Sequence, residues 1–163
     1  MRLVAFAALP AIAVIAWSTQ SLNAQQHEEI YKWQLINGGD GKAMLAYGGE
    51  SPEDMPITLD CKLHSGVIGV FAAETSEALK PNRRINATLA AGSVRSSVPG
   101  KTIPNEDAGV PSFQGTLQAT DPLLDALAGA NSLSIDVGAS HKQVPLKGIG
   151  NKSREFATSC RKP

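Results

Sequence analysis

Residues 57–64 read ITLDCKLH, and apolar and polar side chains alternate through most of the stretch. Successive side chains of a β-strand point to opposite faces, so this period of two predicts a strand with one apolar face. The residues on that face are Ile57, Leu59, Cys61 and Leu63. We therefore expect a β-sheet protein in which a cysteine side chain points into the core.

Similar patterns lie on both sides of this strand. Residues 31–36 and 42–47 flank the turn sequence NGGDG at residues 37–41, which predicts a hairpin. Tyr31 and Trp33 have the spacing of a core-facing strand, so we do not expect them to form an aromatic binding surface. Further strands are expected at residues 67–71, 84–89, 94–98, 113–119, 133–137 and 142–146.

The connections and helices complete the fold prediction. Residues 74–81 fit a short helical turn or a loop, and the proline- and glycine-rich residues 99–111 predict a surface loop. Asp121 followed by Pro122 predicts the start of a helix of about two and a half turns. Asn151 is the expected cap of a last helix that runs to about residue 161. Together these elements predict a mainly β (α+β) fold, an antiparallel β-sandwich or partly open barrel with two short helices in the C-terminal third.

Residues 1–24 have the three-part layout of a secretory signal peptide, with a positive start, an uncharged middle and a polar end that closes on a small residue. A helix of the uncharged residues 3–17 would be roughly 22 Å long, short of the ~30 Å hydrocarbon core, which argues against a retained anchor. We expect cleavage after Ala24, with a cut after Ser21 as the alternative. Residues 25–163 would then fold as a single globular β-rich domain, periplasmic or secreted, without a stable membrane span.

Cys61 and Cys160 are the two cysteines of the chain. An exported protein with an even number of cysteines usually pairs them. A redox role favours a Cys-x-x-Cys pair, and a metal site needs more ligands than two distant cysteines supply. We therefore expect one structural disulfide, closing a long loop for which chain-entropy models give about 4.7 kcal/mol of stabilisation.

The charge balance limits the classes of partner. After residue 24 the chain has 14 basic and 15 acidic residues, a net charge of −1. Nucleic acid and anionic membranes both select for a basic excess, so neither is expected as the main partner. Residues 28–60 hold seven acids and two lysines, whereas residues 142–162 hold six bases and one acid. Either these segments pair across the fold or the basic one faces an acidic partner; the residues expected first in a partner-binding surface are Glu50, Glu53, Asp54, Lys142, Lys147, Lys152 and Arg154.

Candidate catalytic groups are sparse. Residues 100–102, GKT, resemble the end of a phosphate-binding loop, but Arg95 stands where that motif needs its first glycine. Ser140, His141 and Asp136 come nearest to a nucleophile, a base and an orienting carboxylate, although the chain has no Gly-x-Ser-x-Gly elbow. We therefore expect no cofactor, no metal site and no catalytic set.

The layout of the chain also carries a resemblance. A tryptophan in the first strand, a cysteine on a strand and a closing cysteine in CRK at residues 160–162 resemble small uncharacterised periplasmic proteins of proteobacteria. The resemblance implies a Gram-negative periplasmic location and transfers no catalytic residue. We expect an exported accessory or binding domain whose partner is an envelope protein or glycan. A small exported hydrolase and a purely structural envelope protein are the alternatives.

Overall fold

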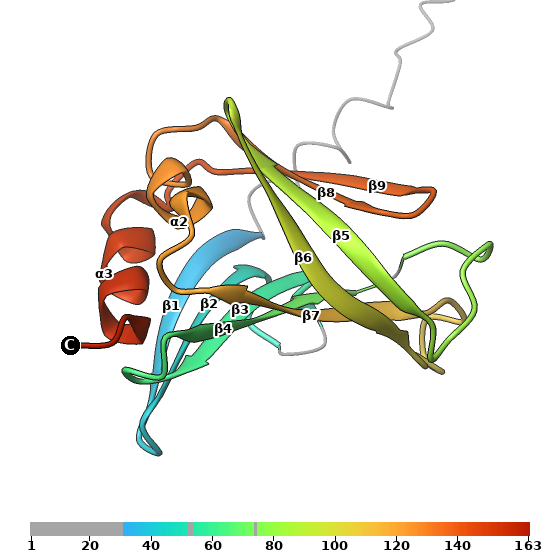
Figure 1. Cartoon of the computed structure of the whole chain (residues 1–163), viewed down its shortest axis with the longest axis horizontal. Coiled ribbons are helices and arrows are strands. Elements are labelled where there is room, and N and C mark those ends of the chain that lie inside the picture. The colour runs from blue at the N-terminus through green and yellow to red at the C-terminus, as the bar shows by residue number, and fades with distance from the viewer. Residues whose placement is uncertain (1–30, 52–53, 74) are drawn as a thin grey trace, which may run out of the picture.

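A computed structural model describes residues 31–51, 54–73 and 75–163 of the chain (Figure 1). In this part, nine antiparallel strands form one sheet in the order β1-β2-β3-β4-β7-β6-β5-β8-β9, curled into a half-barrel. The predicted mainly β fold with two short helices near the C-terminal end is confirmed, in its form as a partly open barrel. The predicted signal peptide lies outside the described residues. The elements are β1 (Lys32–Gly38), β2 (Lys42–Gly48), β3 (Ile57–Lys62), β4 (Val67–Ala72), β5 (Arg84–Ala91), β6 (Val94–Ile103), β7 (Ser112–Gln118), α2 (Pro122–Ala126), β8 (Ser132–Val137), β9 (Ser140–Pro145) and α3 (Gly150–Cys160).

The alternating stretches do form strands. β1 and β2 make the predicted hairpin, with Trp33 opposite Tyr47, and Trp33 is buried as expected. On β3, the side chains of Ile57, Leu59 and Cys61 are all buried. The prediction for Leu63 is wrong, because β3 ends before it and 38% of the residue is exposed. The next residue, at φ 59°, turns the chain toward β4.

The predicted loop at residues 99–111 is wrong over its first part. β6 continues through Pro99 to Ile103, and only residues 104–111 connect it to β7. Pro99 pairs with Asn86 on β5, whereas the pairing of β6 with β7 begins one residue later. Proline lacks an N–H to donate, so it is tolerated where a strand has a neighbour on one side only. Of the two alternatives for the segment before β5, residues 75–81 form turns and no helix.

A short contact between β6 and β7 divides the sheet. The two strands pair only from Gly100 to Ile103 on β6, opposite Ser112 to Gly115 on β7. A Cβ atom added to either Gly100 or Gly115 would lie 2.6 Å from the Cζ atom of Phe113, whose ring is fully buried. The ring therefore occupies the space that two side chains would need. Beyond this contact β5 and β6 diverge from β4 and β7, and α2 and α3 lie at the open side between them (Figure 1).

The helix α2 begins as the sequence predicts. Asp121 is its N-cap and accepts a hydrogen bond of 2.9 Å from the backbone N–H of Leu123. The same carboxylate accepts a hydrogen bond of 2.5 Å from the hydroxyl of Ser96, on the part of β6 that has left β7. These two hydrogen bonds attach α2 to the part of β6 that does not pair with β7. The helix is shorter than expected and ends at Ala126.

The helix α3 is joined to β3 by the predicted disulfide. Cys61 and Cys160 are bonded, with their Cα atoms 5.8 Å apart. The turn after β3 adds two backbone contacts, because the N–H groups of His64 and Gly66 each donate to a carbonyl at the end of α3, over 2.9 Å. The predicted cap at Asn151 is wrong: the helix begins at Gly150, and its capping position makes no side-chain hydrogen bond.

The close approach of β7 and Phe113 to Gly100 predicts that a larger residue at this position destabilises the protein. In the variant Gly100→Ala, the new methyl group would lie 2.3 Å from the carbonyl oxygen of Gln114 and 2.6 Å from the Phe113 ring. We expect the free energy of unfolding, measured by urea denaturation, to fall by about 1–3 kcal/mol, the usual cost of overpacking. The control is Gly39→Ala, where nothing lies within 4 Å of the added atom. It should change stability by less than about 0.5 kcal/mol. Equal stabilities of the two variants would contradict the close contact.

Candidate functional site

The structure brings together two of the three residues considered for nucleophilic catalysis. His141 on β9 lies opposite Asp136 on β8, and its Nδ1 atom is hydrogen-bonded to the Asp136 carboxylate. The hydroxyl of Ser140 instead donates to the backbone carbonyl of Thr75 over 3.0 Å. Neighbouring residues of a strand point to opposite faces, so Ser140 and His141 do not converge. The observed geometry leaves the His–Asp pair without the nucleophile that the sequence offered.

Three of the four basic residues predicted for partner binding lie at or just before the start of α3, and the fourth, Lys142, lies on β9. Lys142 lies on the same side of β9 as the buried Val144, and its ammonium group donates to the carbonyl of Ala73 over 2.8 Å. This contact attaches β9 to the chain that follows β4. Lys152 on α3 donates to the carbonyl of Gly148 over 2.8 Å. The remaining two residues, Lys147 and Arg154, are exposed beside and on that helix.

Two of the acidic residues predicted for partner binding, Glu50 and Asp54, lie in the loop after β2. Glu50 is exposed and lies 3.8 Å from the ammonium group of Lys32, and Asp54 is exposed beside it in the loop. Glu53 lies outside the described residues. The described ion pairs of residues 28–60 join residues of the same segment, such as Asp40 and Lys42. The Lys42 ammonium holds the pKa of Asp40 below its usual value. Between the described residues of the two charged segments, no ion pair forms, so the predicted pairing across the fold is not observed there.

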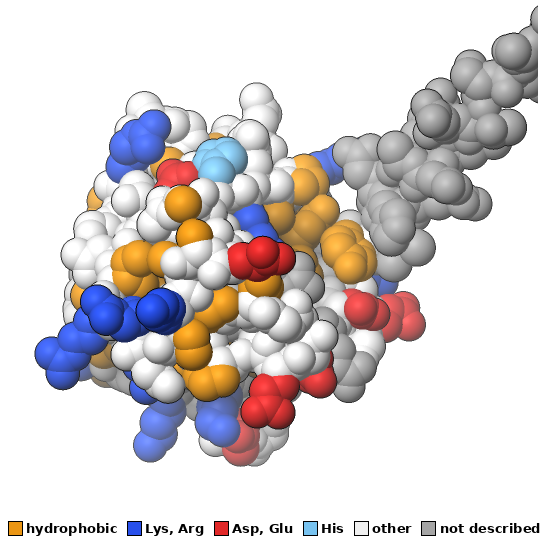
Figure 2. Space-filling view, turned by 90° about the vertical axis from the view of Figure 1, so that its right-hand side faces the viewer, with side chains coloured by type: hydrophobic (Ala, Val, Ile, Leu, Met, Phe, Trp, Pro, Cys, Tyr) orange, Lys and Arg blue, Asp and Glu red, His pale blue; other side chains and the backbone are white. Residues whose placement is uncertain are grey.

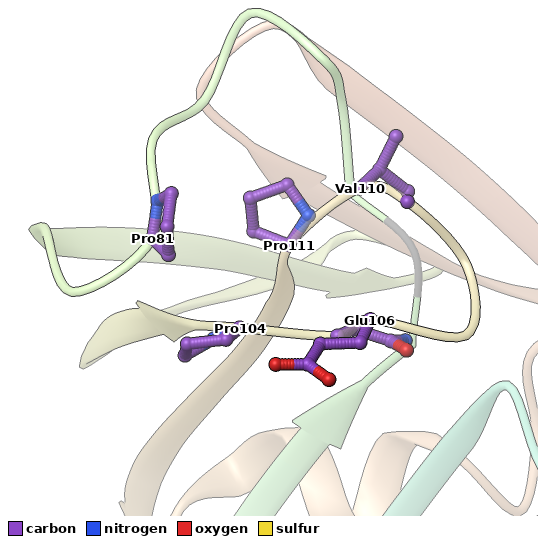
Figure 3. A pocket seen from close by; sticks show the side chains of 7 residues that line it. Pro81, Pro104, Glu106, Val110 and Pro111 are labelled. Carbon is purple, nitrogen blue, oxygen red and sulfur yellow. The ribbon is translucent and has the colours of Figure 1, made fainter.

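A cleft lined by prolines lies at the end of the sheet where β5 begins and β6 ends. Figure 3 shows Pro81, Pro104 and Pro111 around it, with Val110 and Glu106 at its rim. Its volume is about 230 Å³. The other polar side chain that lines the cleft, that of Asn105, donates a hydrogen bond to the hydroxyl of Ser112 and accepts one from the backbone N–H of Ala108. The cleft therefore offers an apolar surface with few groups that could orient a ligand. Figure 2 views this end of the molecule; in the lower part of the view basic side chains lie mainly to the left of an apolar band and acidic ones to the right, and in the upper part the two kinds lie next to each other.

A second hollow lies between the two edges of the sheet. Tyr31 and Tyr47 line it from one edge, with their rings at right angles and 5.9 Å apart, and Pro145 lines it from the other. Its volume is about 300 Å³. The indole N–H of Trp33 donates to the carbonyl of Pro145 over 2.8 Å and so joins the edges. These aromatic side chains help to close the barrel.

The third hollow, here called the glycine hollow, crosses five neighbouring strands on the solvent side of the sheet. Its volume is about 420 Å³, within the range of roughly 300–1,000 Å³ that is usual for ligand sites. Gly69 on β4 has no side chain on the outer face, and the carboxylate of Asp60 lies above it. A Cβ atom added to Gly69 would lie 2.5 Å from an oxygen of this carboxylate. The lining residues are Asp60 on β3, Gly69 on β4, Gln114, Gly115 and Thr116 on β7, Pro99, Gly100 and Lys101 on β6, and Arg84 on β5.

The basic end of the glycine hollow is electrostatically unfavourable without a ligand. Arg84 and Lys101 are directly opposite each other in the β5–β6 register, and both are exposed. Like charges in this position repel. Among the residues that the structure describes, neither forms an ion pair, and Asp60 lies three strands away from Lys101. An anion at this end would relieve the repulsion.

The sequence did not predict this site, although the motif GKT contains two of its residues, Gly100 and Lys101. The likeness of GKT to a phosphate-binding loop is not related to the hollow, because these residues lie in strand β6. The hydroxyl of Thr102 is buried and donates a hydrogen bond to the carbonyl of Lys80. The available signal was glycine within strand patterns, at positions 69 and 115, since such glycines often mark close approach of a backbone or a ligand.

Comparison with known proteins adds little. No protein-family model matches the chain, and no curated protein does. Among solved structures, the chain is similar to invasion associated protein B from Bartonella henselae, with 10% sequence identity, a TM-score of 0.46, and coverage of 77% of this chain and 90% of that one. A likeness of this strength establishes neither a shared fold nor a shared function.

The described residues contain neither a membrane-spanning helix nor a cluster of metal-binding side chains. Across residues 31–51, 54–73 and 75–163, no helix has the length and apolar character needed to cross a membrane. In the same residues, no three side chains of the metal-binding types gather in one place.

The opposed cations predict a stability effect. We expect Lys101→Gln to raise the free energy of unfolding by roughly 0.2–1 kcal/mol in low salt, because it removes a like-charge pair. The gain should shrink in 1 M salt, where the Debye length is about 3 Å. Both are measured by urea denaturation.

The matched control is Lys42→Gln. Lys42 is also opposite a lysine, Lys62, but its ammonium lies 2.8 Å from the carboxylate of Asp40. Its removal should bring no gain in stability. A loss of stability in Lys101→Gln, or equal effects in the two variants, would show that the hollow carries no uncompensated repulsion.

Proposed function

We propose that this protein is an exported binding domain whose ligand, a protein or glycan of the cell envelope or its surroundings, occupies the glycine hollow. Export is supported by the signal-peptide pattern of residues 1–24 and by the Cys61–Cys160 disulfide, since disulfides persist mainly in oxidising compartments. The disulfide also holds a helix against the strand that carries Asp60, and so makes the scaffold behind the hollow rigid.

The observation that carries the proposal is the basic end of the hollow, whose two cations form no ion pair with any residue that the structure describes. Folding places Arg84 and Lys101 opposite each other at the wall of a cavity, and like charges in opposed positions are expected to disfavour the free protein. Sites that bind ligands often hold such unfavourable arrangements, because their cost is recovered only in the complex. A purely structural envelope protein would have no need of this arrangement.

The ligand would be held by side chains alone. The five strands that line the hollow are interior in the order of the sheet, and β6 and β7 pair with each other there from Gly100 and Gly115 onward. Pro99, on the part of β6 that does not pair with β7, has no N–H group to offer an added strand. Addition of a peptide as a further strand requires an exposed edge, so that mode of recognition does not apply here. The charged residues predicted from the sequence, on the loop after β2 and around α3, are the alternative binding surface.

The proposal predicts which surface retains a partner. The full exported protein, purified with its disulfide intact, is immobilised and exposed to an envelope extract of its own organism, and bound components are identified by mass spectrometry. We expect the double variant Arg84→Glu, Lys101→Glu to lose the components that the unchanged protein retains, because charge reversal at the hollow repels an anionic partner.

The control reverses an equal number of charges on the alternative surface, in Lys147→Glu, Arg154→Glu. This variant should retain the same components as the unchanged protein. Loss of binding in the control but not in the hollow variant would move the site to the region of α3. No component retained by the unchanged protein, or retention unaffected by either variant, would contradict binding at the hollow.

A further inference from the structure

We infer that the ligand of the glycine hollow is a saccharide that carries one anionic group, a carboxylate, sulfate or phosphate, on a sugar unit. The inference rests on the proposed function and specifies the chemistry of its ligand. It follows from the kinds of side chain that line the hollow and from their order across the strands.

The anion would bind at the β5–β6 end. Arg84 and Lys101 face each other there, and both are exposed. A guanidinium group presents paired N–H donors that match the two oxygens of a carboxylate or the oxygens of a sulfate or phosphate. The ammonium group of Lys101 adds a second charge without a fixed geometry. An anion bound between the two would convert their repulsion into attraction.

The middle of the hollow suits hydroxyl groups. Gln114 lies opposite Lys101 and offers an amide that both donates and accepts, and Thr116 on the same strand offers a hydroxyl. At the far end, Asp60 offers a carboxylate that only accepts. The hollow therefore runs from side chains that only donate at one end, through side chains that donate and accept, to a carboxylate that only accepts at the other end. A chain of sugar hydroxyls, each of which donates and accepts, meets this pattern.

Apolar contacts complete the surface. Pro99 is exposed in the wall of the hollow, and the half-buried Phe71 lies opposite Gln114 on the same side of the sheet. Both can pack against the C–H faces of a sugar ring. Binding sites commonly combine such apolar surface with a few polar groups that set orientation.

The order of charges argues against densely charged ligands. Asp60 lies at the end of the hollow opposite to Arg84, separated from it by β4, β7 and β6. A polyphosphate or nucleic acid that fills the hollow would bring a second anion to this carboxylate, and like charges repel. A saccharide with one anionic group per bound unit places its charge at one end and hydroxyls at the other.

The test is isothermal titration calorimetry on the full exported protein with its disulfide intact. The probes are maltotetraose with one glucose unit oxidised to glucuronic acid, glucose 6-sulfate and mannose 6-phosphate, which present a single carboxylate, sulfate and phosphate on a sugar. Maltotetraose is the neutral control, and polyglutamate represents an acidic peptide. We expect at least one anionic saccharide to bind, and maltotetraose to bind at least about tenfold more weakly.

Variants assign the contacts. Arg84→Gln and Lys101→Gln should each weaken the anionic saccharide by about tenfold. Gln114→Ala should weaken it by about fivefold, the effect of one neutral hydrogen bond, while leaving the binding of inorganic sulfate or phosphate unchanged. Lys147→Gln, an exposed lysine outside the hollow, should change binding by less than about twofold. Thermal unfolding of each variant confirms that it is folded.

The outcomes separate this inference from the function on which it rests. It is overturned if no anionic saccharide binds, if maltotetraose binds as tightly as the anionic probes, or if polyglutamate alone binds with the same dependence on Arg84. If the saccharides fail while the envelope component retained by the protein still depends on Arg84 and Lys101, the binding function stands and only the ligand class is wrong. If that dependence is also absent, both are wrong.

Discussion

The structure depends on one close contact, in which the Phe113 ring fills the space beside Gly100 and Gly115. Two side chains are missing from opposed positions on β6 and β7, and the aromatic ring takes their place. The contact limits the pairing of the two strands to a few residues, so that the sheet opens beyond it. On the inner side, the opening gives room for α2, α3 and their buried leucine and phenylalanine side chains. On the outer side, the same region of β6 and β7 forms the floor of the glycine hollow.

The opening in the sheet is held by contacts that span long distances in sequence. Ser96 and Asp121 connect the free part of β6 to the start of α2, and Arg161 connects α2 to the end of α3 through Asp125 at 2.9 Å. The disulfide then fixes α3 to β3. Strand β3 supplies Asp60 to the hollow, so the covalent bond in the interior also fixes one end of the site on the surface. The interior and the candidate site are thus two sides of one scaffold.

Local patterns predicted much of this fold, and the reasons for their success and failure are physical. Alternation identified the strands because each one buries a single face, and Asp121 before Pro122 identified a helix start because its hydrogen bonds are local. The continuation of β6 through Pro99 could not be predicted, because a proline is tolerated there only since β6 does not pair with β7 at this residue. That depends on the arrangement of the sheet and not on the local sequence. The cap expected at Asn151 failed because the helix begins at a glycine that needs φ 34°.

The candidate site was beyond local reasoning for a related reason. Its residues come from five strands whose order in the sheet, β3-β4-β7-β6-β5, differs from their order in the chain. The register of the β5–β6 pair opposes Arg84 to Lys101, which gives the hollow its basic end. The central claim, that β6 and β7 are in contact at the Phe113 ring and separate directly beyond it, can be measured by NMR through nuclear Overhauser effects in the isotope-labelled protein. The account predicts effects from the Phe113 ring to the Hα protons of both Gly100 and Gly115, and backbone effects between β6 and β7 that stop at Gly100. Backbone Hα contacts between Val98 and Leu117, which would show that the two strands stay paired, would contradict it.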